Sequence, residues 1–168
     1  MEAGGMARVI VAVTAFNGYD DRRLTEHFHL AEFIESDYAT RHGINNTPSL
    51  RALGNLVRVA NGLERIRSVL GVPIFITSGY RCPELNSAIG GAATSQHLDG
   101  LACDFKVPAY GTPREVCAVI ADNRAFVGFD QLIQEGNWTH VSFSERGRGE
   151  ILTAHFLNGR ATYTKGLA

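Results

Sequence analysis

The sequence lacks an excess of charge of either sign. Its 168 residues carry 16 Lys and Arg against 17 Asp and Glu, a formal net charge of -1, and the pI is about 6.6. Dedicated nucleic-acid-binding domains usually carry a strongly basic face. The charge balance therefore argues against nucleic acid as a partner and leaves open a neutral or mildly charged substrate.

Cysteine is scarce as well. Cys82, Cys103 and Cys117 form no CxxC pair, and an odd number of cysteines does not make a disulfide framework. Free cysteine is among the residue types most often buried in proteins. We expect all three to be reduced and structural, with one disulfide pair as the alternative.

Long apolar runs are also absent. The apolar run at residues 9–15 is too short to cross a membrane. Glu2 and a lone Arg8 make a poor start for a secretion signal, and no clear cleavage site follows them. We expect a first β-strand at this run, no signal peptide and no membrane insertion.

Helical patterns occupy the first half of the chain. Short helices are expected within residues 20–41. Thr47 and Pro48 predict the N-cap and the first position of a long helix. Apolar residues then recur on one helical face over residues 50–70, and Gly71 is a typical residue to end the helix.

The pattern changes to β-structure in the second half. Residues 78–94 are expected to form a Gly-rich loop, while Thr112 and Pro113 predict a helix over 113–122. The Asn-Gly sequence at 158–159 predicts the turn of a final hairpin. Strands are predicted at residues 74–77, 101–106, 131–135, 138–142, 151–156 and 161–163. Helices followed by a mostly antiparallel sheet indicate an α+β fold, with the N-terminal helices packed on the sheet.

Two histidines and one aspartate have the character of metal ligands. Asp104 follows His97 by seven residues, and His140 closes a Trp-Thr-His sequence. A structural zinc usually has four protein ligands, whereas a catalytic zinc has three and keeps one position open. The set predicts a hydrolytic zinc site if the three side chains meet. Asp99 is an alternative to Asp104, and Cys103 is disfavoured because it points to the opposite face of the strand.

The Gly-Asn sequence at 136–137 predicts a two-residue hairpin turn, which pairs Glu135 with Trp138. Side chains alternate along a strand, so Trp138 and His140 share one face, and cross-strand pairing adds Glu135 to it. One hairpin is therefore expected to present a carboxylate and an imidazole together.

Several short motifs surround these residues. They are Ser78-Gly79-Tyr80-Arg81, Asn86, Gly90-Gly91, Ser95-x-His97, the seven-residue step to Asp104, and Trp138-x-His140. Together they resemble the zinc D-Ala-D-Ala carboxypeptidases, a group that includes vancomycin-resistance dipeptidases, phage L-alanyl-D-glutamate endopeptidases and, as a fold relative, the Hedgehog signalling domain. The chain is most similar to the short branch common in phages and prophages. The resemblance implies an extension at residues 1–23 and a single zinc peptidase domain at 24–168.

The resemblance also implies roles for the ligand residues and for an acid. His97, Asp104 and His140 would hold one zinc ion, and Glu135 would be the catalytic carboxylate. In several relatives this acid stands three residues before the last histidine, whereas Glu135 stands five before His140. Asp130 is the alternative base, although the alternation of side chains along a strand would place it on the face opposite to Glu135.

Three further residues are candidates for substrate binding. By the resemblance, Arg81 would lie against a carbonyl or carboxylate of the substrate, or would otherwise form a structural ion pair. Ser95 would contact substrate, and no G-x-S-x-G sequence supports it as a nucleophile. Trp138 is a candidate for the substrate-binding face, with core packing as its competing role.

The function implied by the resemblance is zinc-dependent hydrolysis of an amide bond in peptidoglycan stem peptides. The enzyme would be a D-Ala-D-Ala carboxypeptidase or an endolysin-type endopeptidase. The alternative is a zinc-containing cell-wall-binding or structural phage module without turnover. We expect a monomer that stays in the cytoplasm until phage lysis releases it to the cell wall, or that is carried in the virion.

Overall fold

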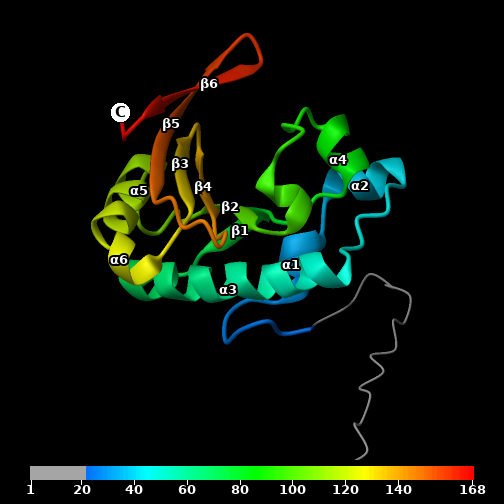
Figure 1. Ribbon diagram of the computed structural model, residues 1–168, viewed down its shortest axis with the longest axis horizontal. Helices are drawn as coiled ribbons and strands as arrows, with labels where there is room; N and C mark the ends of the chain where they lie inside the picture. Colours follow the sequence, from blue (N-terminus) through cyan, green and yellow to red (C-terminus); the bar gives the residue numbers. More distant parts are fainter. Residues whose placement is uncertain (1–21) are drawn as a thin grey trace, which may run out of the picture.

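The strands form a six-stranded sheet in the order β1-β2-β4-β3-β5-β6 within residues 22–168, the part of the chain that the computed structural model describes (Figure 1). Neighbouring strands are antiparallel except β3 and β5, which run parallel. The strands are β1 (Phe75–Ser78), β2 (Ala102–Lys106), β3 (Gln131–Glu135), β4 (Trp138–Ser142), β5 (Glu150–Leu157) and β6 (Arg160–Lys165). The expected α+β class with a mostly antiparallel sheet is confirmed.

Helices surround this sheet. They are α1 (Leu30–Ile34), α2 (Asp37–His42), α3 (Leu50–Leu70), α4 (Pro83–Ala88), α5 (Pro113–Asp122) and α6 (Arg124–Val127), with a 3-10 helix η1 (Gln96–Asp99). The bounds of α5 agree with the prediction, since its first residue follows a Thr112 cap and a proline stands at its first position.

The long helix α3 begins later than the sequence predicts. Ser49 is its N-cap, and the Ser49 hydroxyl accepts a hydrogen bond from the amide of Ala52. The amide and hydroxyl of Thr47 instead bond to the side chain of Asn45, so the predicted Thr47 cap is wrong. Gly71 ends the helix in the left-handed conformation, as expected.

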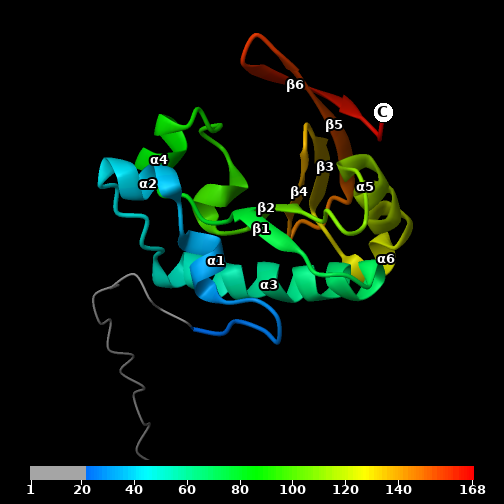
Figure 2. The ribbon, with the colours of Figure 1, turned by 180° about the vertical axis from the view of Figure 1, so that it is seen from behind.

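Helices α3 and α5 pack on one face of the sheet, and the opposite face carries the candidate site. Figures 1 and 2 show α3 running along the base of the molecule from α1 to α6. Phe105, Leu132 and Val141 are fully buried in the core cluster shared with α3 and α5. A side chain at Gly62 of α3 would collide with the ring of Phe143, so this glycine allows the helix to lie close to the strands.

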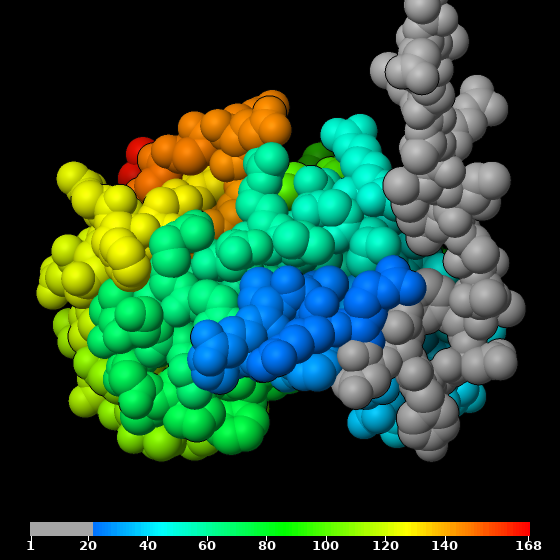
Figure 3. All heavy atoms as spheres, turned by 90° about the horizontal axis from the view of Figure 1, so that it is seen from below, coloured from blue at the N-terminus to red at the C-terminus, as the bar shows by residue number. Residues whose placement is uncertain are grey.

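The segment before α1 crosses the outer side of α3 (Figure 3). There the His27 amide donates to one carboxylate oxygen of Glu64 at 2.8 Å, and the His27 ring lies 2.9 Å from the other. Helix α1 packs against β1. The predicted packing of N-terminal helices on the sheet is therefore confirmed for α1.

Part of the predicted loop at residues 78–94 is helical instead. Cys82 is the N-cap of α4, its sulfur accepts a hydrogen bond from the Leu85 amide, and Pro83 occupies the first helical position. Strand β1 also lies one residue later than predicted, and β5 and β6 are longer than predicted.

The three cysteines are free and buried, as expected. The strand expected at residues 9–15 lies outside the described residues, and the domain limits at 1–23 and 24–168 stay predictions. Across residues 22–168, none of the helices has the length and apolar character that crossing a membrane would require.

Candidate metal centre

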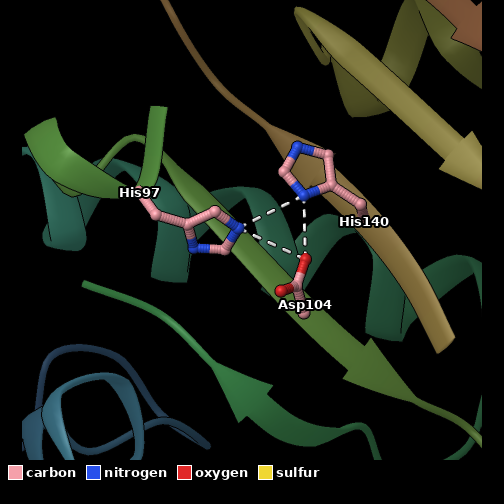
Figure 4. Close-up of side chains that lie close together, drawn as sticks. All are labelled: His97, Asp104 and His140. Atoms are coloured by element: carbon pink, nitrogen blue, oxygen red, sulfur yellow. Dashed lines mark hydrogen bonds and ion pairs between the residues drawn. The ribbon is translucent and has the colours of Figure 1, made fainter. Parts of the chain in front are cut away.

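Three side chains from separate stretches of chain converge on one point (Figure 4). His97 comes from η1, Asp104 from β2 and His140 from β4. His97 Nε2 lies 3.3 Å from both His140 Nδ1 and Asp104 Oδ1, and His140 Nδ1 lies 2.8 Å from the same Asp104 oxygen. All three are buried, and their ligand atoms are close enough together to hold a metal ion.

The sheet register and one tight turn assemble this group. Asp104 and His140 are direct partners in the β2–β4 ladder, so they share a face. Gly100 ends η1 in the left-handed conformation at a φ of 68°, which returns the chain to β2. A Cβ atom at Gly100 would lie 2.7 Å from the Ala52 carbonyl oxygen of α3. This turn against α3 therefore fixes where His97 stands relative to β2.

The second ring nitrogen of His97 is fixed by the backbone. His97 Nδ1 lies 2.6 Å from the Gly79 carbonyl oxygen, which requires a proton on Nδ1 and leaves Nε2 as the ligand atom. Gly79 itself lies against α1, since a Cβ atom there would be 2.5 Å from the Phe33 carbonyl oxygen. The Tyr80 amide donates to that same Phe33 oxygen at 2.7 Å.

The Asp104 carboxyl is held in its ionised, ligand form. Burial would raise its pKa, but the charges and hydrogen bonds of His97 and His140 outweigh burial and hold the pKa of Asp104 well below its usual range. Arg81 Nη2 also donates to Asp104 Oδ2 at 2.6 Å. One oxygen thus binds Arg81, while the other points at the two imidazoles.

Arg81 is itself held in place. Its Nε donates to the Ser78 hydroxyl at 2.9 Å, and Ser78 is the β1 partner of Asp104. The side chain of Arg81 is mostly buried. The ion pair that the sequence offered as an alternative for Arg81 is therefore present, and its partner is a candidate metal ligand.

The separations among the ligand atoms suit a small tetrahedral cation. Zinc binds nitrogen and oxygen at about 2.0–2.2 Å, so two ligands of a tetrahedral zinc stand about 3.3 Å apart. Two of the three separations here are 3.3 Å, and the third, between His140 and Asp104, is a hydrogen-bond distance of 2.8 Å. Two imidazoles and one carboxylate also leave one tetrahedral position open. The residues therefore fit a catalytic zinc ion.

Glu135 lies on the face that carries the ligands. It pairs with Trp138 across the β3–β4 turn, as predicted, and His140 is on the same face two residues further along β4. Burial raises the pKa of Glu135 above its ordinary value, against the opposing charge of His140, and a hydrogen bond from the Trp138 side chain also opposes the rise. A half-buried carboxyl with a raised pKa beside a metal site has the properties of a general base.

Asp130, the alternative base, has structural partners. Arg148 donates to both of its oxygens, from Nε at 3.0 Å and from Nη2 at 2.7 Å, and the Gln96 side chain donates to one of them at 3.0 Å. The hydrogen bonds from Arg148 hold the pKa of Asp130 well below its usual range. These bonds bring Asp130 and η1 together and make Asp130 a poor proton acceptor.

The remaining candidates lie as follows. Ser95 is the N-cap of η1, and its hydroxyl accepts a hydrogen bond from the His97 amide. Trp138 is half-buried and stands beside the ring of Phe156, outside the core cluster. Asp99 is exposed at the end of η1 and outside the ligand group. Burial raises the pKa of the Cys103 thiol, which is a poor metal ligand as a result.

A cavity of about 360 Å³ adjoins the metal centre at the β1 edge. Ser78 and Arg81 line it on the side of the sheet, and Tyr38 and Asp37 line it from α2. Arg81 thus lines this cavity and also bonds to Asp104.

A sequence profile of the peptidase M15 family matches residues 26–142. The chain belongs to this family. The match takes in all three ligand residues, Arg81 and Glu135, and it confirms the predicted likeness to the zinc D-Ala-D-Ala carboxypeptidases. No curated protein matches the chain. Family membership makes the chain a peptidase, and the peptidase M15 match ends at the last residue of β4, so β5 and β6 lie beyond it.

The sequence did not indicate two parts of the site. One is the Gly79 carbonyl that orients His97. A glycine in the loop before His97 is its only trace in the sequence. The other is the contact between Arg81 and Asp104, which depends on the pairing of β1 with β2. A pairing between strands this far apart in the sequence has no local signature.

Proposed function

We propose that this protein is a zinc-dependent peptidase that hydrolyses an amide bond in peptidoglycan stem peptides. The observation that carries the proposal is the position of Glu135, on one sheet face with Asp104 and His140. A carboxyl of raised pKa beside a three-ligand metal site suits metal-assisted hydrolysis of an amide.

The ion held by His97, Asp104 and His140 would supply a Lewis acid that activates water and polarises the scissile carbonyl. Glu135 accepts the proton of the attacking water and then delivers it to the leaving amine. The raised pKa of Glu135 makes the carboxylate a better proton acceptor and brings its pKa closer to neutral pH, where the same group can accept a proton and later release it.

Arg81 has two roles in the proposal. Its bonds to Asp104 and Ser78 use the Nη2 and Nε sides of the guanidinium. They fix the direction in which Asp104 presents its ligand oxygen. We assign Nη1 to a substrate oxygen, since the guanidinium keeps its charge at every physiological pH. Ser95 and Trp138 are assigned to substrate binding at the edges of the metal centre.

The substrate is assigned from the family resemblance and from the open metal position. Stem peptides contain D-residues, and the reaction would be that of a D-Ala-D-Ala carboxypeptidase or of an endolysin-type endopeptidase. We place the enzyme at the cell wall, as a monomer released by phage lysis or carried in the virion. Glu135 argues against a binding module without turnover, because such a module has no need of a base.

The test is digestion of purified peptidoglycan by the zinc-loaded protein, with mass spectrometry of the released muropeptides. We expect one new cleavage product, which should disappear when a chelator is added and return when zinc is added back. Zinc bound tightly with no product from any muropeptide would favour the binding module. Activity that resists both chelation and the Glu135→Ala change would exclude the proposed chemistry.

A further inference from the structure

The sheet face of the metal centre continues beyond the peptidase M15 match, onto β5 and β6. His140 pairs with Ile133 in β3, Ile133 with Leu152 in β5, and Leu152 with Lys165 in β6. Paired residues project to the same side of a sheet. The three strands therefore place Ile133, Leu152 and Lys165 in one row with the metal ligands.

The next row leads from Glu135 to Tyr163. Glu135 is one residue beyond the Gln134–Thr153 pair and so lies level with Ala154, whose partner in β6 is Tyr163. The only side chain between Glu135 and Tyr163 in this row is the methyl group of Ala154. Burial, and then the negative charges of Glu135 and Asp104, raise the pKa of Tyr163. Tyr163 thus lies on the same sheet face as the metal centre.

Phe156 adds a second ring on the same face. It follows Ala154 by two residues in β5, and its ring centroid lies 5.8 Å from that of Trp138, with the two planes at 49°. Phe156 is 49% exposed and Tyr163 is 52% exposed. We call Trp138, Phe156 and Tyr163, with Ala154 as their floor, the aromatic shelf.

Two rings of the aromatic shelf, those of Phe156 and Tyr163, are exposed to solvent. Exposed aromatic rings that lie together beside a site are typical of a binding surface. The β5–β6 hairpin that carries two of the rings extends away from α3 past the β3–β4 turn (Figures 1 and 2). These two rings lie beyond residues 26–142, the part of the chain that the peptidase M15 profile matches.

We propose that the aromatic shelf binds the stem peptide on one side of the scissile amide, as an extended chain whose alanine residues lie against the rings. This inference rests on the proposed function and deepens it. The rings would pack against the peptide backbone and its methyl groups, and the Tyr163 hydroxyl would bond to a main-chain amide. Ile133, Leu152 and Ala154 form an apolar floor between the shelf and the metal centre, and Lys165 stands in the same row as Ile133 and Leu152.

The distance along the sheet sets the length of peptide needed. Tyr163 stands three strands from His140, a span of about 14 Å at the usual strand spacing. An extended peptide advances about 3.3 Å per residue, so about four residues reach from the metal centre to Tyr163. A dipeptide centred on the metal cannot reach Tyr163, whereas a stem pentapeptide can.

The test is calorimetric binding of synthetic stem peptides, from dipeptide to pentapeptide, to the zinc-loaded protein carrying Glu135→Gln to prevent turnover. We expect Phe156→Ala and Tyr163→Ala each to weaken pentapeptide binding about tenfold and to leave dipeptide binding within about twofold. Tyr163→Phe separates the hydroxyl from the ring. Phe126→Ala is the matched control, because Phe126 is 56% exposed on α6 and away from the metal centre.

Each other outcome decides between the two proposals. Pentapeptide binding that neither change weakens, or a loss equal for every peptide length, overturns the shelf and leaves the proposed function standing. Binding of a chitin oligosaccharide that depends on Tyr163, without any effect on peptides, overturns the peptide as occupant. If the shelf variants weaken binding only of long peptides, but the protein with Glu135 intact cleaves no amide, the shelf is supported and the proposed peptidase activity is wrong. Zinc content and circular dichroism of each variant confirm that it is folded.

Discussion

Asp104 lies directly opposite His140 in the β2–β4 ladder, and its Oδ1 atom is 2.8 Å from His140 Nδ1. Two of the three candidate ligands are therefore held by the backbone hydrogen bonds of neighbouring strands in the middle of the sheet. Only His97 is supplied from outside the sheet, by η1. Sites built on regular elements hold their geometry better than sites on loops.

Replacement of any ligand by alanine should remove metal and activity together. Two remaining ligands hold zinc far less tightly than three, so His97→Ala, Asp104→Ala and His140→Ala should each purify with little zinc. Metal content by mass spectrometry and turnover on peptidoglycan measure the two losses. His155→Ala is the control, since His155 is an exposed histidine on β5 outside the ligand group. A ligand variant that keeps full zinc occupancy would remove that residue from the metal centre.

Replacement of Glu135 by glutamine should separate metal binding from turnover. The amide keeps the shape of the side chain but accepts no proton, so kcat should fall by about 10²–10⁴ while zinc content stays unchanged. Single-turnover kinetics on a muropeptide measure the loss. Asp130→Asn is the comparison, and an inactive Asp130→Asn beside an active Glu135→Gln would reverse the assignment of the base.

The change Arg81→Lys should weaken the metal centre without removing a ligand. A lysine cannot bond to Asp104 and Ser78 at once as the guanidinium does. Loss of a group that orients a ligand typically lowers metal affinity about 10–100-fold. Competition with a zinc chelator measures the affinity. Arg58→Lys, at the exposed ion pair with Glu145, should change nothing, and equal affinities in the two variants would contradict the positioning role.

The pH profile of kcat/KM should report Glu135. Because burial raises the pKa of this carboxyl above its ordinary value of 4.5, the base gains its active, ionised form only at higher pH. Activity should therefore rise with pH on the acid side, with a midpoint above 4.5. Profiles measured in buffers that do not chelate zinc would show it. An acid limb at the ordinary carboxyl value would mean that a different group titrates.

Asp130 should contribute to acid stability. The bonds from Arg148 hold its pKa below the unfolded value, so this contribution is complete above the unfolded pKa and is lost as the pH falls toward the folded pKa. Asp130→Asn should cost about 2 kcal/mol near neutrality, since Arg148 reaches solvent and the pair is partly screened. Urea unfolding between pH 7 and roughly pH 2 should show the difference narrowing as the pH falls. A constant difference would assign the effect to packing.

Local chemistry made the β3–β4 hairpin predictable. A Gly at the first turn position fixes the register, and the observed pairing of Glu135 with Trp138 follows from it. The start of α3 was predicted wrongly because Thr47 and Ser49 are both acceptable caps, and only the competing bonds of Asn45 decide between them.

The pairing of strands that are far apart in the chain could not be predicted from the sequence. The motif around His97 and Asp104 predicted a shared metal site, but nothing local indicates that β2 pairs with β4 or that β5 runs parallel to β3. Those two pairings bring His140 to Asp104 and carry Tyr163 onto the same face. They are set by burial of the whole sheet against α3 and α5, a property of the assembled core.

The single peptide group between Gly79 and Tyr80 joins the first helix to the metal centre. The Phe33 carbonyl of α1 receives the Tyr80 amide, and the Gly79 carbonyl holds the His97 ring. A cation at His97 therefore stabilises the docking of α1, and by reciprocity a loosened α1 lowers the affinity for the cation. We therefore expect ion binding and the docking of α1 to be thermodynamically linked.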